Sequence, residues 1–347
     1  MANFSDSVWE AAQYKLNEMM NMPEYKHKAS AAIQMFLRNT DFLVPTSERE
    51  RLWTQKPSDQ STVNLYTINK AATSAVTNRA YDHTGSNGDS TETAVTYVTR
   101  GQTFKYSIKQ SDRQIWDMAD MLAKQLLAHA IELHSTIETY LTSYLNTNKS
   151  QAVVSASPTG GAWDGTNHIF KVDKADENLM FQRFRGFMRQ QYYGGNYDIL
   201  HDEFATQKAE FLIQQGQGND TNYNWQMAGL TGFASQEIVP GSGYDSQAYM
   251  IPFGTVGILP WLPMKNREGF GDTFQNGGAY RTIADPLGTG LQFAIHEYAT
   301  GADNQSTYGE RQDVDVQVEM TLDFAPVKAP MSTSNASPIF KVGLLDT

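Results

Sequence analysis

Hydrophobic positions in residues 111–148 recur every three or four residues, which is the spacing of one face of an α-helix. Ser111 and Gln114 have the form of a capping box at its start, and the run contains no Pro or Gly. The apolar seam consists of Ile115, Ala119, Leu122, Leu126, His129, Leu133, Ile137, Tyr140 and Tyr144. At about 1.5 Å per residue the helix would be roughly 55 Å long. We therefore expect a spine that crosses a large, flat subunit.

A strict alternation of apolar and polar residues over 313–324 predicts a long β-strand. The residues of its apolar face are Val314, Val316, Val318, Met320, Leu322 and Phe324. Residues 291–298 are typical of a partner strand, with a bend near 301–304, so the pair forms an antiparallel hairpin. Because the hairpin and the spine have similar lengths, their apolar faces should pack together.

Two segments before the spine look like appendages. Residues 1–60 predict two short amphipathic helices, one capped by Ser5 and one over 31–38, with too little apolar surface to fold alone. Residues 61–110 predict strands on both sides of a turn at Gly101 and a polar tip over 77–92. An isolated ribbon is marginal in water. Both segments should therefore dock on the body or on another copy.

After the spine, residues 155–167 have the Gly- and Pro-rich composition of a boundary. Residues 177–285 then mix helical patterns with short strands, which indicates an α+β unit inserted between the spine and the hairpin.

The charge of the chain is acidic and unevenly distributed. The net charge is −11, which argues against a dedicated nucleic-acid binder. Residues 61–110 carry a net charge of +2, whereas 111–347 carry −12. Either this is an ordinary solvated surface, or the basic segment lies on the acidic body of a neighbouring copy.

The sequence contains no recognisable catalytic motif. It has no cysteine, no H-E-x-x-H pair, no phosphate-binding loop and no G-x-S-x-G elbow. His129 lies in the spine seam, where a packed core residue is the simpler interpretation. The N-terminus lacks a signal peptide, and the apolar stretch 251–264 is too short and too rich in Pro to span a bilayer. We expect a soluble, cytoplasmically made protein that is not an enzyme and has no cofactor or metal.

The order of these parts is an arm, a β-excursion, a spine helix, an inserted α+β unit and a return hairpin. This order resembles the major capsid proteins of tailed bacteriophages with the Hong Kong 97-type fold. Three strings add to the resemblance: Ser111-Asp112-Arg113 before the spine, 221–226 and 254–263. The last two are similar to capsid proteins of phages that infect Bacteroidetes.

The resemblance implies an α+β fold and a shell protein of hexamers and pentamers that form an icosahedral or prolate head around double-stranded DNA. DNA would touch the inner face without sequence specificity. The resemblance also implies assembly in the host bacterial cytoplasm, a place in the virion, and separate scaffolding, portal and decoration proteins. Two alternatives stay open: an encapsulin-like nanocompartment shell and a soluble β-rich hydrolytic enzyme.

By the same resemblance, the chain divides into named parts. They are an N-terminal arm (1–60), an E-loop (61–110), a first peripheral-domain part with the spine (111–176), an axial domain (177–285), the return hairpin (286–335) and a C-terminal tail (336–347). The residues that we expect at contacts between copies are Trp9, Leu16, Arg100, Phe104, Lys105 and Tyr106.

Overall fold

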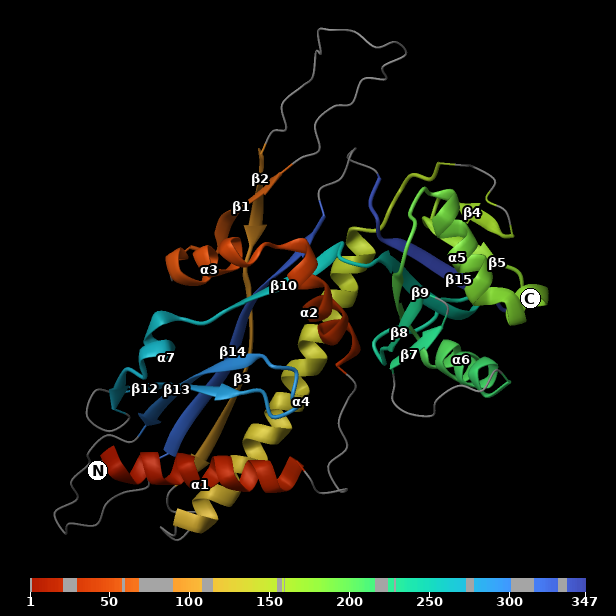
Figure 1. Ribbon diagram of the computed structural model, residues 1–347. Coiled ribbons are helices and arrows are strands. Elements are labelled where there is room, and N and C mark those ends of the chain that lie inside the picture. The colour runs from red at the N-terminus through yellow and green to blue at the C-terminus, as the bar shows by residue number, and fades with distance from the viewer. Residues whose placement is uncertain are drawn as a thin grey trace, which may run out of the picture.

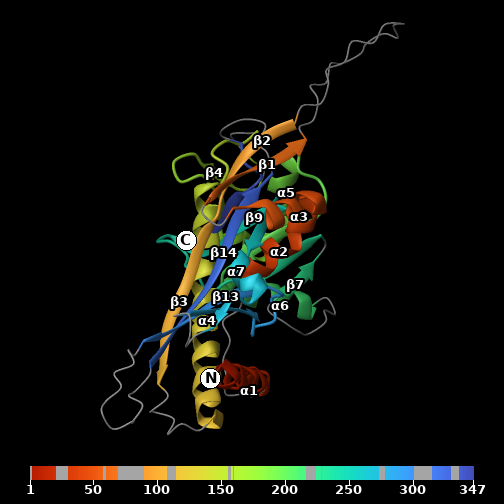
Figure 2. The same ribbon diagram turned by 90° about the vertical axis from the view of Figure 1, so that its left-hand side faces the viewer.

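The computed structural model describes most of the chain. The described residues are 2–20, 30–57, 60–68, 90–107, 115–154, 158, 160–215, 224–227, 229–272, 278–300, 315–329 and 336–347. In the view of Figure 1 the molecule is broad, and after a quarter turn it is narrow (Figure 2). The two views agree with a flat, elongated subunit.

The helices include the predicted spine. Helix α4 (Ile115–Thr147) is continuous over 33 residues, and its seam residues Leu122, Leu126, Leu133 and Ile137 are fully buried. The remaining helical segments are α1 (Ala2–Met20), α2 (Ala31–Leu43), α3 (Thr46–Gln55), the 3-10 turn η1 (Lys174–Leu179), α5 (Met180–Gln190), α6 (Glu203–Gln215) and α7 (Met264–Glu268). The spine prediction is confirmed for residues 115–147, whereas the capping box predicted at Ser111 and Gln114 lies outside the described residues. The prediction of Ser5 as a cap is wrong, because α1 already begins at Ala2.

A six-stranded antiparallel sheet lies beside the spine (Figure 1). Its strands are β10 (Val256–Trp261), β14 (Asp315–Lys328), β13 (Gln292–Thr300), β12 (Gly278–Ala284), β11 (Gly271–Asp272) and β3 (Val98–Ser107). Strands β13 and β14 are the predicted hairpin. Apolar residues of α1, α2, α4, β13 and β14 share one core, so the predicted packing of hairpin on spine is confirmed.

Strand β14 is paired along both edges. Strand β3 pairs with residues 315–324 of β14 on one edge. On the other edge, β13 pairs with residues 315–321 of β14 and β10 pairs with residues 323–328. Asp323 and Phe324 pair with both β3 and β10, which shows that β3 and β10 lie on opposite edges. Gly101 lies inside β3 opposite Thr321, so the predicted turn at Gly101 is wrong. The reason is the continuous ladder to β14, which keeps the backbone extended through the glycine.

A two-stranded ribbon projects from the same end as α3 (Figure 1). It consists of β1 (Thr62–Ile68) and β2 (Ser90–Thr96), paired antiparallel from Thr62–Thr96 to Ile68–Ser90. Most of the predicted polar tip over 77–92 lies outside the described residues.

A seven-stranded mixed sheet forms the other half of the molecule. In spatial order its strands are β4 (Ala162–Asp164), β5 (Ile169–Val172), β15 (Phe340–Leu345), β9 (Tyr244–Pro252), β6 (Tyr197–His201), β8 (Leu230–Ala234) and β7 (Asn224–Met227). Helices α5 and α6 pack on this sheet, and their apolar residues form with it a second hydrophobic core, separate from the core around the spine.

The two sheets divide the chain differently from the predicted parts. The final strand β15 lies between β5 and β9, in the middle of the seven-stranded sheet, where a C-terminal tail was expected. Strands β10 and β12, from the expected axial part, belong to the six-stranded sheet instead. Pairing between strands that are distant in sequence leaves no mark on the local hydrophobic pattern, so the sequence could not place these strands.

Candidate functional site

Four of the six predicted contact residues are buried in the chain's own core. These residues are Trp9, Leu16, Phe104 and Tyr106. Glu297 of β13, which has no exposed surface, accepts hydrogen bonds from the indole of Trp9, from the Tyr106 hydroxyl (3.2 Å) and from Arg281 Nε (2.9 Å). Helix α1 thus docks on this chain through a buried carboxylate. Contact of these four residues with a second copy stays a prediction.

The other two predicted residues lie on β3. Lys105 is exposed, whereas the Arg100 guanidinium lies 4.8 Å from the centre of the Tyr140 ring of α4. Phe104 stacks on His129 at 4.8 Å between ring centres, so His129 packs against the sheet as expected, although it is only partly buried and lies at the margin of the core. Within the described residues, β3 pairs only with β14, and its outer edge faces away from the sheet.

Helix α3, which the sequence did not predict, braces the β1–β2 ribbon. Arg51 of α3 donates to the Asn64 carbonyl at 2.7 Å and lies 5.2 Å from the centre of the Tyr66 ring, both on β1. Its guanidinium is itself held by Glu48 at 2.9 Å. One side chain therefore ties the helix to the backbone and to a ring of the ribbon.

A cluster of cations and aromatic rings lies where α3, β10 and α7 meet. The Arg267 guanidinium is 4.1 Å from the centre of the Trp53 ring and 5.4 Å from that of Trp261. Arg267 also donates to the carbonyls of Leu262 (2.8 Å) and Trp53 (2.6 Å). The Lys56 ammonium lies 3.6 Å from the centre of the Trp261 ring. Such contacts are worth about 0.5–2 kcal/mol each, and together they fix the base of the ribbon.

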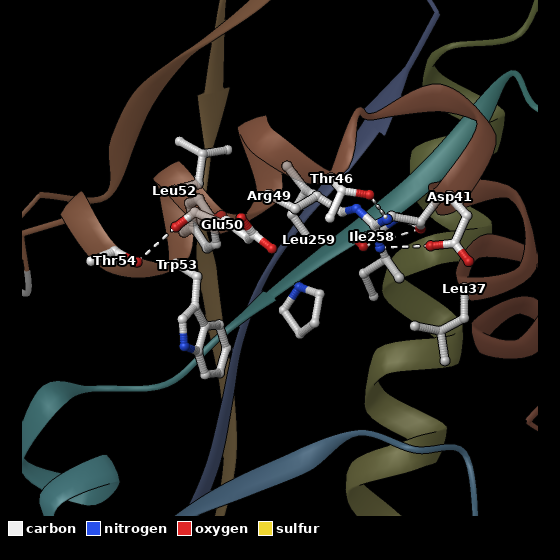
Figure 3. A pocket seen from close by; sticks show the side chains of 13 residues that line it. Leu37, Asp41, Thr46, Arg49, Glu50, Leu52, Trp53, Thr54, Ile258 and Leu259 are labelled. Carbon is white, nitrogen blue, oxygen red and sulfur yellow. Dashed lines mark hydrogen bonds and ion pairs between the residues drawn. The ribbon is translucent and has the colours of Figure 1, made fainter.

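A pocket of about 370 Å³ opens next to this cluster (Figure 3). Its walls come mainly from α2, α3 and β10, and they combine Leu52, Trp53 and Pro260 with several polar residues. Among these, Arg49 donates to Asp41 at 2.6 Å and to Thr46 at 3.2 Å (Figure 3). The pocket has the chemistry to hold an apolar side chain beside a charged rim.

The start of α2 is held by the spine instead of by its own cap residue. Glu138 of α4, which is 3% exposed, accepts hydrogen bonds from the backbone amides of Ala32 (2.8 Å) and Ile33 (3.4 Å) and from Ser235 (2.8 Å). Burial raises the pKa of Glu138 to about 7. Ser30, at the cap position, makes no side-chain cap bond to α2.

One turn earlier on the spine, His134 makes a second buried polar contact. Its Nδ1 lies 2.5 Å from the Ser30 hydroxyl, and its Nε2 lies 3.0 Å from Asp285. In the seven-stranded sheet, burial lowers the pKa of His201 to about 4 and raises the pKa of Asp202. Asp202 accepts hydrogen bonds from Ser246 and from the amides of Ala205 and Gln247, which is a structural role.

These polar groups join segments of the chain and do not converge on a substrate. In the described ranges, no three His, Cys, Asp or Glu side chains are placed to hold a metal ion. No helix among these residues combines the length and the apolar character needed to cross a bilayer. The arrangement is suited to holding an arm and a ribbon at fixed positions on a flat body.

Sequence reasoning missed the residues that hold the appendages. Glu138, Glu297, Lys56 and Arg267 have no motif around them. The one usable signal was that His134 and Glu138 lie four residues apart on the spine, so both project from one side of it.

Comparisons with known proteins identify the fold. No protein-family model and no curated protein sequence matches the chain. A chain of the capsid asymmetric unit of Cyanophage A-1(L) is similar with a TM-score of 0.56 and 10% identity, over 92% of this chain and 94% of that one. A chain of the capsid asymmetric unit of Cyanophage Pam1 has a TM-score of 0.52 and 11% identity, over 94% of both. The expected Bacteroidetes host stays a prediction. The chain has the fold of these capsid chains, which confirms the predicted α+β architecture of the Hong Kong 97 type.

Proposed function

We propose that this chain is the major capsid protein of a tailed bacteriophage. Copies of it assemble into the hexamers and pentamers of an icosahedral or prolate head that encloses double-stranded DNA. The observation that carries the proposal is the likeness to two phage capsid chains over more than nine-tenths of each chain, at TM-scores of 0.52 and 0.56.

The distribution of the contacts within the chain supports this role. In the described part of the chain, the projecting β1–β2 ribbon is held on the body by α3, beside the Lys56–Arg267 cluster. A two-stranded ribbon alone is marginal in water. In the proposed shell the ribbon, as the E-loop, lies on a neighbouring copy. The six-stranded sheet with the spine then serves as the peripheral domain, and the seven-stranded sheet, which includes β15, serves as the axial domain.

Further parts of the proposal follow from the shell. The protein belongs to the virion and assembles in the cytoplasm of the host bacterium. Scaffolding, portal and decoration proteins are separate chains, and DNA meets the inner face without sequence specificity.

The test is to express the chain, alone and with the candidate scaffolding protein of its phage, and to measure particle mass by light scattering. We expect closed shells of megadalton mass in negative-stain micrographs. A small oligomer under both conditions would contradict the proposal. Purified shells that contain protein and no nuclease-protected DNA would identify a nanocompartment instead.

Two charge-reversal variants test the contact predicted at Lys105. Lys105→Glu, on the outer strand β3, should prevent shell formation and leave a folded subunit. Lys124→Glu changes another exposed lysine, on α4, by the same charge and should assemble normally. Normal shells from Lys105→Glu would remove Lys105 from the proposed contacts and leave the capsid role standing.

A further inference from the structure

Three lysines from different elements gather at the C-terminal end of the spine helix. Lys149 follows α4, Lys328 is the last residue of β14, and Lys341 lies in β15. All three are half-buried. The segment after α4 is fixed against the segment before β15, because the Ser150 amide donates to the Ile339 carbonyl at 2.7 Å. Folding thus brings together three cations that are far apart in sequence.

Two asparagines at the end of α4 and one tyrosine contact the three ammonium groups. Lys149 donates to Asn146 Oδ1 (3.3 Å), and the Tyr249 hydroxyl donates to the same oxygen (3.2 Å). The Lys341 ammonium lies 5.6 Å from the centre of the Tyr249 ring. Lys328 donates to Asn148 Oδ1 at 2.6 Å. Lys149 and Lys341 therefore share one small network, and Lys328 binds the asparagine that precedes Lys149 in the chain.

The patch lacks the counter-charge that an acidic protein could readily supply. Among the described residues, none of the three lysines forms an ion pair with a carboxylate, although the chain has a net charge of −11. Asp164, whose charge acts on Lys149, is bound to Lys171 at 2.7 Å.

The helix end does not explain the cluster. The carbonyl end of a helix favours a nearby cation, which would account for one lysine. Burial nevertheless lowers the pKa of all three, and the charge of Lys149 lowers that of Lys341 further. Burial thus disfavours the charged form of each lysine, and an anion bound nearby would favour that form again.

We infer that this lysine cluster, Lys149, Lys328 and Lys341, binds phosphate groups of the packaged duplex DNA. The inference rests on the proposed capsid function, which supplies the DNA. Lysine ammonium groups bind phosphate oxygens as compact point charges. A local cationic patch on an acidic chain would hold the duplex at few points and leave the rest of the surface repulsive.

The test compares two triple variants with the same change in charge. The site variant is Lys149→Gln, Lys328→Gln, Lys341→Gln. The control is Lys124→Gln, Lys174→Gln, Lys265→Gln, which replaces three lysines elsewhere in the chain. Binding of the unassembled full-length chain to a fluorescein-labelled duplex is measured by anisotropy over a series of salt concentrations. Inorganic phosphate and poly-glutamate serve as competitors.

We expect the site variant to lose at least tenfold in affinity at low salt, and the control less than threefold. The slope of log K against log salt should fall by roughly 0.9 for each phosphate group that the variant no longer binds, so by up to about 3 in the site variant. Equal reductions in affinity in both variants would overturn the inference in favour of general electrostatics. Poly-glutamate that competes better than an equal charge of duplex would also overturn it and would indicate an acidic segment of a second copy.

Two further variants separate loss of the site from loss of the fold. The triple variant Lys149→Arg, Lys328→Arg, Lys341→Arg keeps the three charges. Its affinity for the duplex should be at least half that of the wild type. If the triple Gln variant does not fold, Lys149→Gln alone, outside any helix or strand, should still lower the salt slope by roughly 0.9, and an unchanged slope would refute the site. Shell assembly is scored separately, so a variant that assembles and binds DNA normally refutes this inference and not the capsid role.

Discussion

The carboxylate of Glu138 gives a sharp test of how the spine holds the arm. It accepts the amides of Ala32 and Ile33 in the first turn of α2 and the hydroxyl of Ser235, in a site that is 3% exposed. Glu138→Ala would remove the acceptor and leave these donors buried. Glu138→Gln keeps the shape and one acceptor oxygen, and serves as the matched control.

The expected loss can be worked from these contacts. A buried donor without a partner costs about 1–3 kcal/mol, and loss of a helix cap costs about 1 kcal/mol. With two amides and one hydroxyl affected, Glu138→Ala should lower the free energy of unfolding by about 3–5 kcal/mol. Domains are stable by only about 5–15 kcal/mol, so this loss is large. Glu138→Gln should lose about 1–2 kcal/mol, because the Ala32 bond can persist.

The pH dependence follows from the same site. Burial raises the pKa of Glu138 from 4.5 to about 7, so the folded state binds this proton more tightly than the unfolded state. The resulting stabilisation is fully present below pH 4.5 and is lost as the pH rises through 7. It is of the order of 3 kcal/mol. Glu138→Gln has no such proton, so this downward slope should disappear from the variant.

Urea unfolding followed by tryptophan fluorescence at pH 5 and pH 8 measures the free energies. Hydrogen exchange of a peptide that covers α2 locates the effect. The reasoning is refuted if Glu138→Ala leaves the exchange of α2 at the wild-type rate, or if Glu138→Gln keeps the wild-type pH slope.

Two other predictions use the same unfolding assay. Burial lowers the pKa of His201 to about 4, so the stability that neutral His201 contributes is lost as the pH falls from about 6.5 towards 4. His201→Gln should therefore reduce the fall of the unfolding free energy over this pH range, and an unchanged slope would contradict the prediction. Gly101→Ala would place a Cβ 2.6 Å from Thr321 Cγ2 and 3.0 Å from the Met320 carbonyl oxygen, so it should lose about 1–3 kcal/mol. Gly186→Ala lies in α5, where nothing apart from the backbone of its own helix is within 4 Å of the new Cβ, so it should raise the free energy of unfolding by about 0.5–1 kcal/mol. Two glycine variants that both raise or both lower this free energy would contradict the packing argument.

The features that the sequence predicted are those whose signal is local and periodic. The spine and the β13–β14 hairpin each carry one apolar face over many residues, and both were found with nearly correct limits. Helix α3 was missed because its sequence, 46–55, has a single buried residue, Leu52, and apart from the neighbouring Trp53 only polar side chains. Its role depends on Arg51 and the ribbon, a contact that no periodicity records.

The features that the sequence did not predict depend on contacts between distant segments. Gly101 was placed at a turn because glycine between two strand-like runs favours one. Its extended conformation is imposed by β14, more than two hundred residues later. The same is true of β15, whose short apolar run could have paired with any neighbouring strand. The buried carboxylates Glu138 and Glu297 look like ordinary surface charges until their partners are known.

Helix α2 determines how the two halves of the molecule are held together. Its Asn39 donates to Asp198 of β6 at 2.6 Å, in the seven-stranded sheet. The next residue, Thr40, accepts from the Ile258 amide of β10 at 2.9 Å, in the six-stranded sheet. Adjacent residues of one helix thus bind both sheets, and Glu138 anchors that helix to the spine. In the proposed shell, many copies must keep one shape, which requires the two halves of each copy to stay at a fixed angle, and this buried joint supplies that constraint.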